Sequence, residues 1–211
     1  MAGRRYVTAL AALFAVTWFV LAIEPRHRAD WALENTLVVL AVLVLARAHR
    51  RLALSRLSYT LVFVFLSLHV VGAHYTYSEV PYDTWVTALT GRSLNARLGW
   101  QRNNFDRIAH LAYGLLMSYP VREVIVRVTG LRGFWGYLLP MDLVMSSSAS
   151  YELIEWGAAL VFGGDLGIAY VGAQGDPWDA QKDMSLAALG AVVATAATAA
   201  AERLRGSRPS G

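Results

Sequence analysis

Residues 134–162 read FWGYLLPMDLVMSSSASYELIEWGAALVF, and this stretch decides the class of fold. It is apolar and long enough to cross the hydrocarbon core of a bilayer, which takes about 20 residues of helix. Glu152 and Glu155 interrupt it and, at a spacing of three, share one helical face. Because a carboxylate in hydrocarbon is costly, we expect the pair to face a bundle interior, find partners and serve a function.

The whole chain has the composition of a membrane protein. Of its 211 residues, 56% are hydrophobic and 16% are charged, which is too apolar for an ordinary soluble domain of this length. We therefore expect one integral membrane domain over residues 1–211, with the lipid bilayer as its main partner. The chain has no cysteine, so any metal would have to be held by His, Asp or Glu. The formal charge of +4 does not indicate nucleic-acid binding, because the arginines divide among short connections and topology explains them.

The distribution of apolar segments predicts an all-α fold, a polytopic transmembrane helix bundle with about six spans. The fifth span is too long to be straight, and Pro140, Asp142 and the serines of 146–150 predict a kink or break within it. The last span carries Ala187 and Gly190 among other small residues, which predicts close packing against neighbouring helices. The expected spans are 6–23, 31–47, 57–75, 106–126, 134–162 and 179–201.

The basic residues predict how these spans are oriented. Of the 19 lysines and arginines, 12 lie at the N-terminus, in 47–56, in 122–132 and at the C-terminus, while acidic residues gather in the other three connections. By the positive-inside rule both termini are cytoplasmic. The long connection 76–105 contains several tyrosines and tryptophans, so we expect an interfacial loop on the extracytoplasmic surface.

Two pairs of ionisable residues lie one helical turn apart. Glu152 and Glu155 either share a proton or bind a cation, unless they reach out to the interface or bond to the serines of neighbouring turns. Asp106 and His110, at the start of the fourth span, share one face about 6 Å apart along the helix axis, which places the carboxylate to orient or charge the imidazole. Alternatively, Asp106 only complements the positive end of its helix, with Asn104 as the N-cap.

Residues 174–184, QGDPWDAQKDM, form the most motif-like segment. Its pattern predicts Asp176 as an N-cap, Pro177 at the first helical position and Asp179 as the acid of a capping box. Asp183 lies one turn deeper on the face of Asp179, just before a long alanine-rich span, where an acid needs a partner.

The candidate site combines residues from four helices that are expected at one membrane face. Zinc and hard divalent cations accept His, Asp and Glu ligands, but the spacing matches no known metal motif, so the cofactor stays open, with a divalent metal ion as the candidate. The catalytic candidates are Glu152, Glu155 and His110. The ligand-binding candidates are His74, Tyr75, Asp106, Arg107, Gln174, Asp176, Asp179 and Asp183. The candidate metal ligands are His74, His110, Glu155 and Asp183.

Taken together, these motifs resemble the YjdF family of bacterial inner-membrane proteins. The resemblance covers most of the chain from about residue 57 onward and rests on HYTY at 74–77, DRIAH at 106–110, YELIEW at 151–156, and QGDPWD at 174–179 with the following Asp183 and Met184. More distantly, the order of motifs is similar to that of VanZ-like proteins, which are associated with the cell envelope. The resemblance implies a multi-pass protein of the bacterial inner (cytoplasmic) membrane, but neither family supplies an established reaction.

Four functions are consistent with the sequence. The first is a buried His/Asp/Glu site near the extracytoplasmic face that binds a cation, a proton or a polar envelope ligand. The second is a membrane-embedded enzyme, such as a metal-assisted hydrolase of a lipid or cell-envelope precursor. In it, Glu152 or Glu155 would act as general base, His110 as acid or base, and Arg107 as a clamp for an anionic headgroup. A small transporter and a non-catalytic scaffold are the others. We favour the first, and whether the protein is an enzyme stays open.

Overall fold

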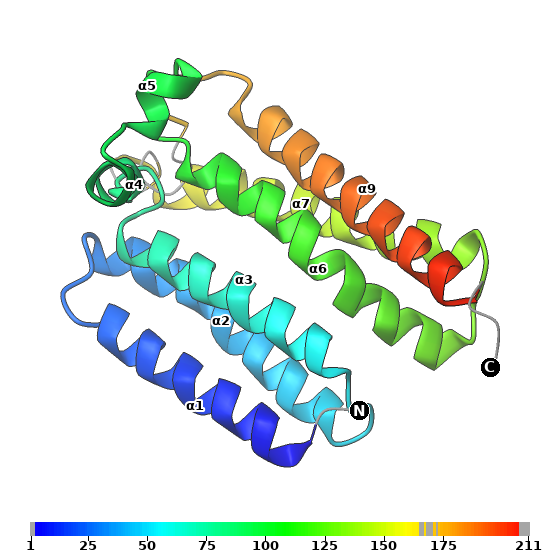
Figure 1. Cartoon of the computed structure of the whole chain (residues 1–211). Coiled ribbons are helices and arrows are strands. Elements are labelled where there is room, and N and C mark those ends of the chain that lie inside the picture. The colour runs from blue at the N-terminus through cyan, green and yellow to red at the C-terminus, as the bar shows by residue number, and fades with distance from the viewer. Residues whose placement is uncertain (1–2, 165–166, 168–170, 172, 207–211) are drawn as a thin grey trace.

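The computed structural model describes residues 3–164, 167, 171 and 173–206. Over these residues the chain forms eight helices and no strand, labelled as in Figure 1. The helices are α1 (Arg4–Leu21), α2 (Arg28–His49), α3 (Arg56–His74), α4 (Tyr82–Thr90), α5 (Leu94–Leu98), α6 (Phe105–Thr129), α7 (Trp135–Phe162) and α9 (Asp179–Gly206). The all-α prediction is confirmed for the described residues, and each of the six expected spans corresponds to one long helix.

The six long helices pack side by side, and each runs antiparallel to the long helix before it (Figure 1). In one group, α3 contacts both α1 and α2; in the other, α6, α7 and α9 all contact one another. The contact between α3 and α6 joins the two groups, and the short helices α4 and α5 lie at the end where α3 stops and α6 begins.

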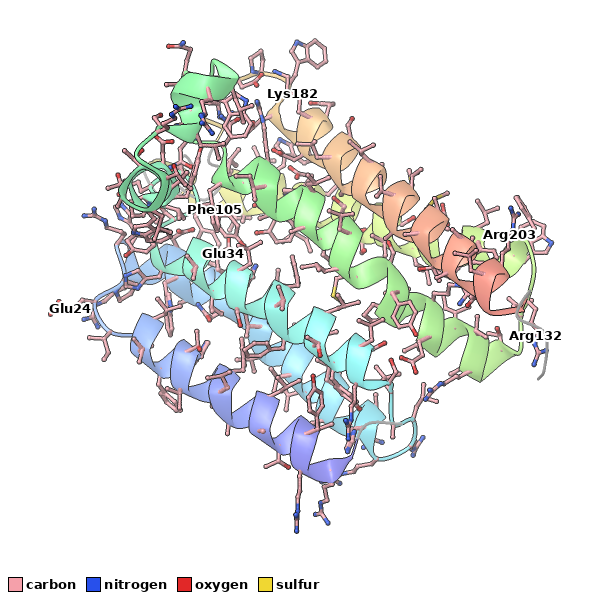
Figure 2. All side chains as sticks on the ribbon, viewed as in Figure 1. Glu24, Glu34, Phe105, Arg132, Lys182 and Arg203 are labelled. Atoms are coloured by element: carbon pink, nitrogen blue, oxygen red, sulfur yellow. The ribbon has the colours of Figure 1, made fainter. Side chains whose placement is uncertain are left out.

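Four helices, α1, α2, α3 and α9, are long and apolar enough to cross a membrane. The other two long helices, α6 with 25 residues and α7 with 28, are long enough to cross but lack an equally apolar stretch. Figure 2 shows Arg132 and Arg203 at one end of the bundle, and Glu24 and Lys182 at the opposite end. The more basic connections therefore lie together, as the charge pattern requires.

Helix α7 is continuous through its proline. It runs from Trp135 to Phe162, and Pro140 lies in its second turn, where the missing N–H removes a single intrahelical hydrogen bond. The hydroxyls of Ser147 and Ser150 donate to backbone carbonyls of the preceding turn at 2.9 and 2.8 Å, which satisfies these polar groups within the helix. The helix has no break within this span, so that part of the prediction is wrong, while the kink stays a prediction.

Small residues bring the backbones of α6 and α9 into direct contact. A Cβ atom on Gly114 would overlap the carbonyl oxygen of Ala187 and lie 2.7 Å from the amide nitrogen of Ala191. A Cβ atom on Gly190 would lie 2.8 Å from the amide nitrogen of Leu115. Both alanines are fully buried. The predicted close packing of the last helix is confirmed, and it fixes the distance between the starts of α6 and α9.

The connection between α3 and α6 is more ordered than the predicted interfacial loop, since it contains α4 and α5. The Tyr82 hydroxyl accepts the N–H of Asn104 at 3.0 Å and donates to Asn95 Oδ1 at 2.7 Å. Asp83 accepts hydrogen bonds from the N–H of Asn95 and the Ser93 hydroxyl, which lower the pKa of its carboxyl. These bonds hold the chain in place where α6 begins, next to the polar groups described below.

Candidate functional site

Ionisable side chains from three helices meet near the starts of α6 and α9. We call Asp106, His110, Glu152, Glu155 and Asp183 the acid–histidine cluster. His110, Glu155 and Asp183 are buried, the last with only 1% of its surface exposed. Asp106, His110 and Asp183 each offer a ligand atom that lies within 4.8 Å of the other two. The structure thus assembles, from α6, α7 and α9, five of the residues predicted to form the site.

His110 lies at the centre of the cluster. Its Nε2 atom is 3.6 Å from Asp106 Oδ1 and 3.2 Å from Glu152 Oε1. Its Nδ1 atom is 3.3 Å from the Ser148 hydroxyl oxygen on α7. The predicted proximity of Asp106 and His110 is confirmed, and Asp106 does more than complement the end of its helix because it faces the imidazole.

Two carboxylate oxygens in the cluster have no hydrogen-bond donor. Glu152 Oε1 and Asp183 Oδ1 are buried, and neither accepts a hydrogen bond in the part of the chain that the structure describes, although His110 Nε2 lies 3.2 Å from the Glu152 atom. A buried carboxylate oxygen is costly unless a proton, a donor or a cation satisfies it. The cluster therefore has the chemistry of a site that takes up a positive charge.

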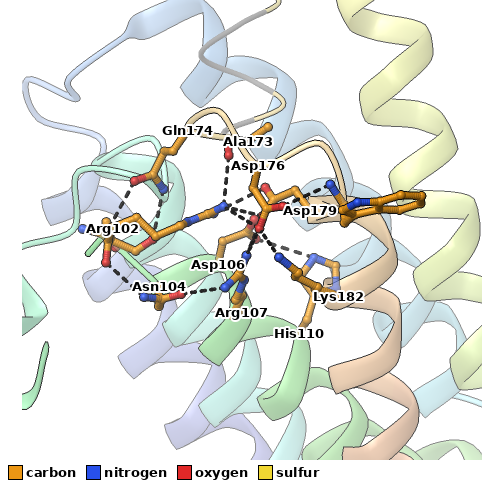
Figure 3. Close-up of polar contacts among 12 residues, drawn as sticks. Arg102, Asn104, Asp106, Arg107, His110, Ala173, Gln174, Asp176, Asp179 and Lys182 are labelled. Atoms are coloured by element: carbon orange, nitrogen blue, oxygen red, sulfur yellow. Dashed lines mark hydrogen bonds and ion pairs between the residues drawn. The ribbon is translucent and has the colours of Figure 1, made fainter. Parts of the chain in front are cut away.

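A second set of charges lies beside this cluster and contains no histidine. This outer ion-pair network, shown in Figure 3, comprises Arg102, Arg107, Asp176, Asp179 and Lys182. Arg102 Nη1 donates to Asp179 Oδ1 at 2.5 Å, and Arg107 Nη2 donates to Asp176 Oδ2 at 2.5 Å. Lys182 Nζ donates to the same Asp176 oxygen at 2.6 Å. The network ties the segment before α6, and α6 itself, to the start of α9.

The hydrogen bond from Lys182 is the largest of several contacts that lower the pKa of Asp176 to about 2. Asp176 Oδ1 also accepts the N–H of Trp178 at 3.1 Å, as predicted for a capping residue. In a capping box, the Asp179 carboxylate would accept the N–H of Asp176. That N–H instead donates to the Ala173 carbonyl at 2.9 Å, and the Asp179 carboxylate binds Arg102, so the predicted capping box is wrong. Helix α9 begins at Asp179, two residues after the position predicted from Pro177.

The segment before α6 makes its own cap and a second link to α9. Asn104 lies at the N-cap position of α6, as predicted, but its side chain makes no capping bond and accepts a hydrogen bond from Arg107 at 3.2 Å. The Asn103 side chain accepts the N–H of Phe105 at 3.0 Å instead. Gln174 exchanges two hydrogen bonds with the backbone of Asn103, at 3.2 and 3.0 Å. Gln174 is exposed, so it closes the outer side of the site and does not point into the cluster.

A cavity of about 190 Å³ lies between the two helix groups and borders the cluster. Its apolar wall comes from residues of α2, α3 and α6. Its polar lining includes Asp106 and His110 on one side and His69, Tyr77 and Tyr151 on the other. The site is therefore next to a space that can hold water or a small ligand.

The other side of the cavity contains a second polar group. The Tyr151 hydroxyl donates to both carboxylate oxygens of Glu34 at 3.0 Å, and His69 Nε2 lies 3.7 Å from Glu34 Oε2. The Tyr77 hydroxyl lies 2.5 Å from His69 Nδ1. Tyr77 has a positive φ of 50°, which folds its ring back onto Gly72. Burial in this position raises the pKa of Tyr77.

The chain matches the family described as "Predicted membrane protein (DUF2238)" over residues 6–203. It belongs to this family. It is also 37% identical over 171 residues to inner membrane protein YjdF of Escherichia coli (strain K12), an alignment that covers 81% of this chain and 78% of that protein. No solved structure matches the chain. The DUF2238 membership and the apolar helices identify an integral inner-membrane protein, as the resemblance to the YjdF family implied. The more distant resemblance to VanZ-like proteins stays a prediction.

Two of the predicted site residues of this DUF2238 protein lie outside the acid–histidine cluster. His74 Nδ1 lies 2.8 Å from the backbone carbonyl oxygen of Leu21, at the end of α1. Tyr75 packs its ring edge-on against His74, with centroids 4.5 Å apart, and also against Trp85. The structure does not bring His74 or Tyr75 to the acid–histidine cluster.

Four residues at or beside the site were not predicted from the sequence: Glu34, His69, Tyr151 and Arg102. Glu34 lies in the predicted second span, and its charge within apolar sequence was a usable signal. His69 gave the same kind of signal, because it is an ionisable residue within the apolar third span. No sequence signal marked Arg102, because its partner Asp179 is far away in the sequence.

Proposed function

We propose that this inner-membrane protein binds a divalent cation in the acid–histidine cluster, on the extracytoplasmic side of the membrane. The observation that supports this most directly is the proximity of Asp106, His110 and Asp183, whose ligand atoms lie within 4.8 Å of one another. The buried and unpartnered Oδ1 atom of Asp183 points to the same conclusion, because a metal ion would satisfy it. One imidazole and two carboxylates form a ligand set that zinc accepts.

The distances in the cluster are close to those between the ligands of a metal ion. Zinc ligands at about 2.0–2.1 Å from the metal stand roughly 3.3 Å apart in a tetrahedral site. His110 Nε2 and Asp106 Oδ1, at 3.6 Å, already lie near this separation. Glu152, with Oε1 at 3.2 Å from His110 Nε2, is the nearest candidate for a fourth ligand.

Metal content of the purified protein tests the proposal. The protein is purified in detergent without chelator or metal-affinity tag, and its metal is measured by elemental analysis. We expect about one zinc ion per chain in the wild type and a loss of that metal in Asp183→Asn and in His110→Gln. Asp142→Asn is the matched control, because Asp142 is an exposed acid of α7 outside the cluster. Circular dichroism checks that each variant is folded.

A wild type without metal that also fails to take up added zinc in a competition titration with a chromophoric chelator would exclude a divalent-cation site. Equal metal content in the wild type, Asp183→Asn and His110→Gln would place any bound metal elsewhere.

The location of the site rests on six membrane crossings with both termini in the cytoplasm. The positions of Arg132 and Arg203 opposite Lys182 support this orientation (Figure 2), since basic residues favour the cytoplasmic side. Because the chain has no cysteine, single cysteines report topology without background. Leu89→Cys on α4 should react with an impermeant thiol reagent in intact cells, and Val128→Cys at the end of α6 should react only after permeabilisation. Both positions are well exposed, at 86% and 70%. The opposite labelling pattern would invert the proposed orientation.

A further inference from the structure

A long apolar groove lies between α1, α2 and α3, away from the acid–histidine cluster. Helix α1 lies at the edge of the bundle and packs on α3 (Figure 1). The groove beside it has a volume of about 770 Å³, within the usual range of ligand sites. Its walls are almost wholly aliphatic and aromatic, with Phe14, Val42 and Phe63 among the lining residues.

The two ends of the groove differ in chemistry. At one end Trp18 Nε1 donates to Asn35 Oδ1 at 2.6 Å, and the Trp18 and Trp31 rings lie 5.7 Å apart, which joins α1 to α2. The Asn35 amide in turn donates to the Trp31 carbonyl at 2.7 Å. The polar groups at this end are thus bonded to each other, and the groove offers an apolar ligand little but hydrocarbon contact there.

Arg4 and Arg50 line the other end. Arg4 starts α1 and Arg50 directly follows α2, so the antiparallel arrangement brings both to the same end of the bundle. Both are exposed, and neither forms an ion pair with a carboxylate of the described residues. Guanidinium groups recognise phosphate oxygens through paired hydrogen bonds.

We infer that this groove binds an anionic phospholipid of the cytoplasmic leaflet. One acyl chain lies along the apolar walls toward Trp18, and the phosphate lies between Arg4 and Arg50. Basic pockets between membrane helices on the cytoplasmic side are sites for anionic headgroups, and here the pocket continues into a slot of suitable chemistry for the chain. This site is independent of the proposed cation site, which lies at the other end of the bundle.

Native mass spectrometry of the full chain, titrated in detergent with phosphatidylglycerol or phosphatidylcholine, tests the inference. The wild type is expected to bind phosphatidylglycerol in preference to phosphatidylcholine. Arg4→Gln/Arg50→Gln is expected to weaken phosphatidylglycerol binding by about 30-fold, taking the usual contribution of a basic side chain near an anionic surface for each arginine. The control Arg5→Gln/Arg51→Gln removes the same charge from neighbouring exposed positions outside the groove and should bind nearly as the wild type does.

A second pair of variants tests the groove itself. Ala11→Trp fills it without changing charge, while Ala12→Trp adds the same side chain to a neighbouring exposed position that does not line it. Loss of phosphatidylglycerol in Ala11→Trp alone would support a seated acyl chain. Equal weakening by the two arginine pairs would show surface attraction only, and equal binding of the two lipids would show a site for neutral lipid; either result would overturn the inference.

Discussion

Gly190→Ala is the sharpest test of how the fold positions the site, because it adds a single methyl group between α6 and α9. The new Cβ atom would lie 2.8 Å from the Leu115 amide nitrogen and 3.1 Å from the Gly114 carbonyl carbon, and closer still to the Leu111 carbonyl oxygen. Ordinary contacts of a Cβ atom begin at 3.4 Å. The neighbouring atoms are backbone and have no rotamer that removes the clash, so the two helices must separate by on the order of 1 Å.

The cost of this separation exceeds the benefit of alanine to the helix. Overpacking in a well-packed interface costs about 1–3 kcal/mol, whereas replacing glycine by alanine inside a helix contributes about 1 kcal/mol in the other direction. Because three backbone atoms are affected, the cost should lie in the upper part of the overpacking range, about 2–3 kcal/mol. After the benefit of alanine is subtracted, we expect Gly190→Ala to lower the free energy of unfolding by roughly 1–2 kcal/mol. Denaturant unfolding in mixed micelles, followed by circular dichroism, measures the difference.

Gly157→Ala in α7 is the matched control. A Cβ atom there would meet nothing within 4 Å, so this variant is expected to be as stable as the wild type or slightly more stable. If Gly190→Ala unfolds at the same denaturant concentration as Gly157→Ala, the close contact of α6 with α9 does not exist in the membrane protein. The same separation would also move Asp183 away from Asp106 and His110, so the proposed metal affinity should fall in Gly190→Ala and not in the control.

Three further changes test the polar contacts around the site. Arg102→Gln removes the short bonds to Asp179 and is expected to lower the free energy of unfolding by roughly 3 kcal/mol, because both side chains are mostly buried and the carboxylate loses its partner; a loss below that of an ordinary surface substitution would contradict this. The pKa of Asp176 is lowered from 3.8 to about 2, so its ionised form stabilises the folded protein above pH 3.8 and this contribution disappears as the pH falls through about 2. The difference in melting temperature between the wild type and Asp176→Asn should therefore shrink on acidification, and a difference that grows would show the opposite sign of linkage. Tyr151→Phe removes the donor to both oxygens of buried Glu34 and should cost about 1–3 kcal/mol in the same unfolding assay, whereas an unchanged stability would mean that this bond contributes nothing.

The helices were predictable because their signal is local. The apolar length of each segment gave six ranges that match the long helices to within a few residues, including α7 from Trp135 to Phe162. The pairing of Asp106 with His110 was equally predictable, since two residues four apart on a helix must share a face. The close packing of the last helix followed from the small residues around Gly190, because only close-packed helices gain from lacking side chains. That its close partner is α6 could not be read from the sequence.

The residues that the sequence did not place correctly depend on which face of a helix packs inward. On α3, His69 faces Glu34 and the cavity, while His74 lies five residues later, against α1. The two histidines are equivalent by hydropathy, and only the contacts of α3 with α1 and α2 distinguish them. Arg102 is a similar case, since a loop residue finds a distant partner only when the fold brings the two segments together.

The two charge groups differ in how their acids are paired with arginine and lysine side chains. Arg102 and Arg107 are held at 2.5 Å by the aspartates of the outer network, and Lys182 adds a third cation to the same pair. Two carboxylates are thus matched by three positive groups outside. Among the described residues the four acids of the acid–histidine cluster form an ion pair only with His110, while Arg102 and Arg107 act on Asp106 from a greater distance. An unmatched buried carboxylate is costly, so the inner acids must be neutralised by protons or by a cation that binds among them. The metal analysis proposed above distinguishes these alternatives, because only a bound metal ion would be lost in Asp183→Asn and His110→Gln.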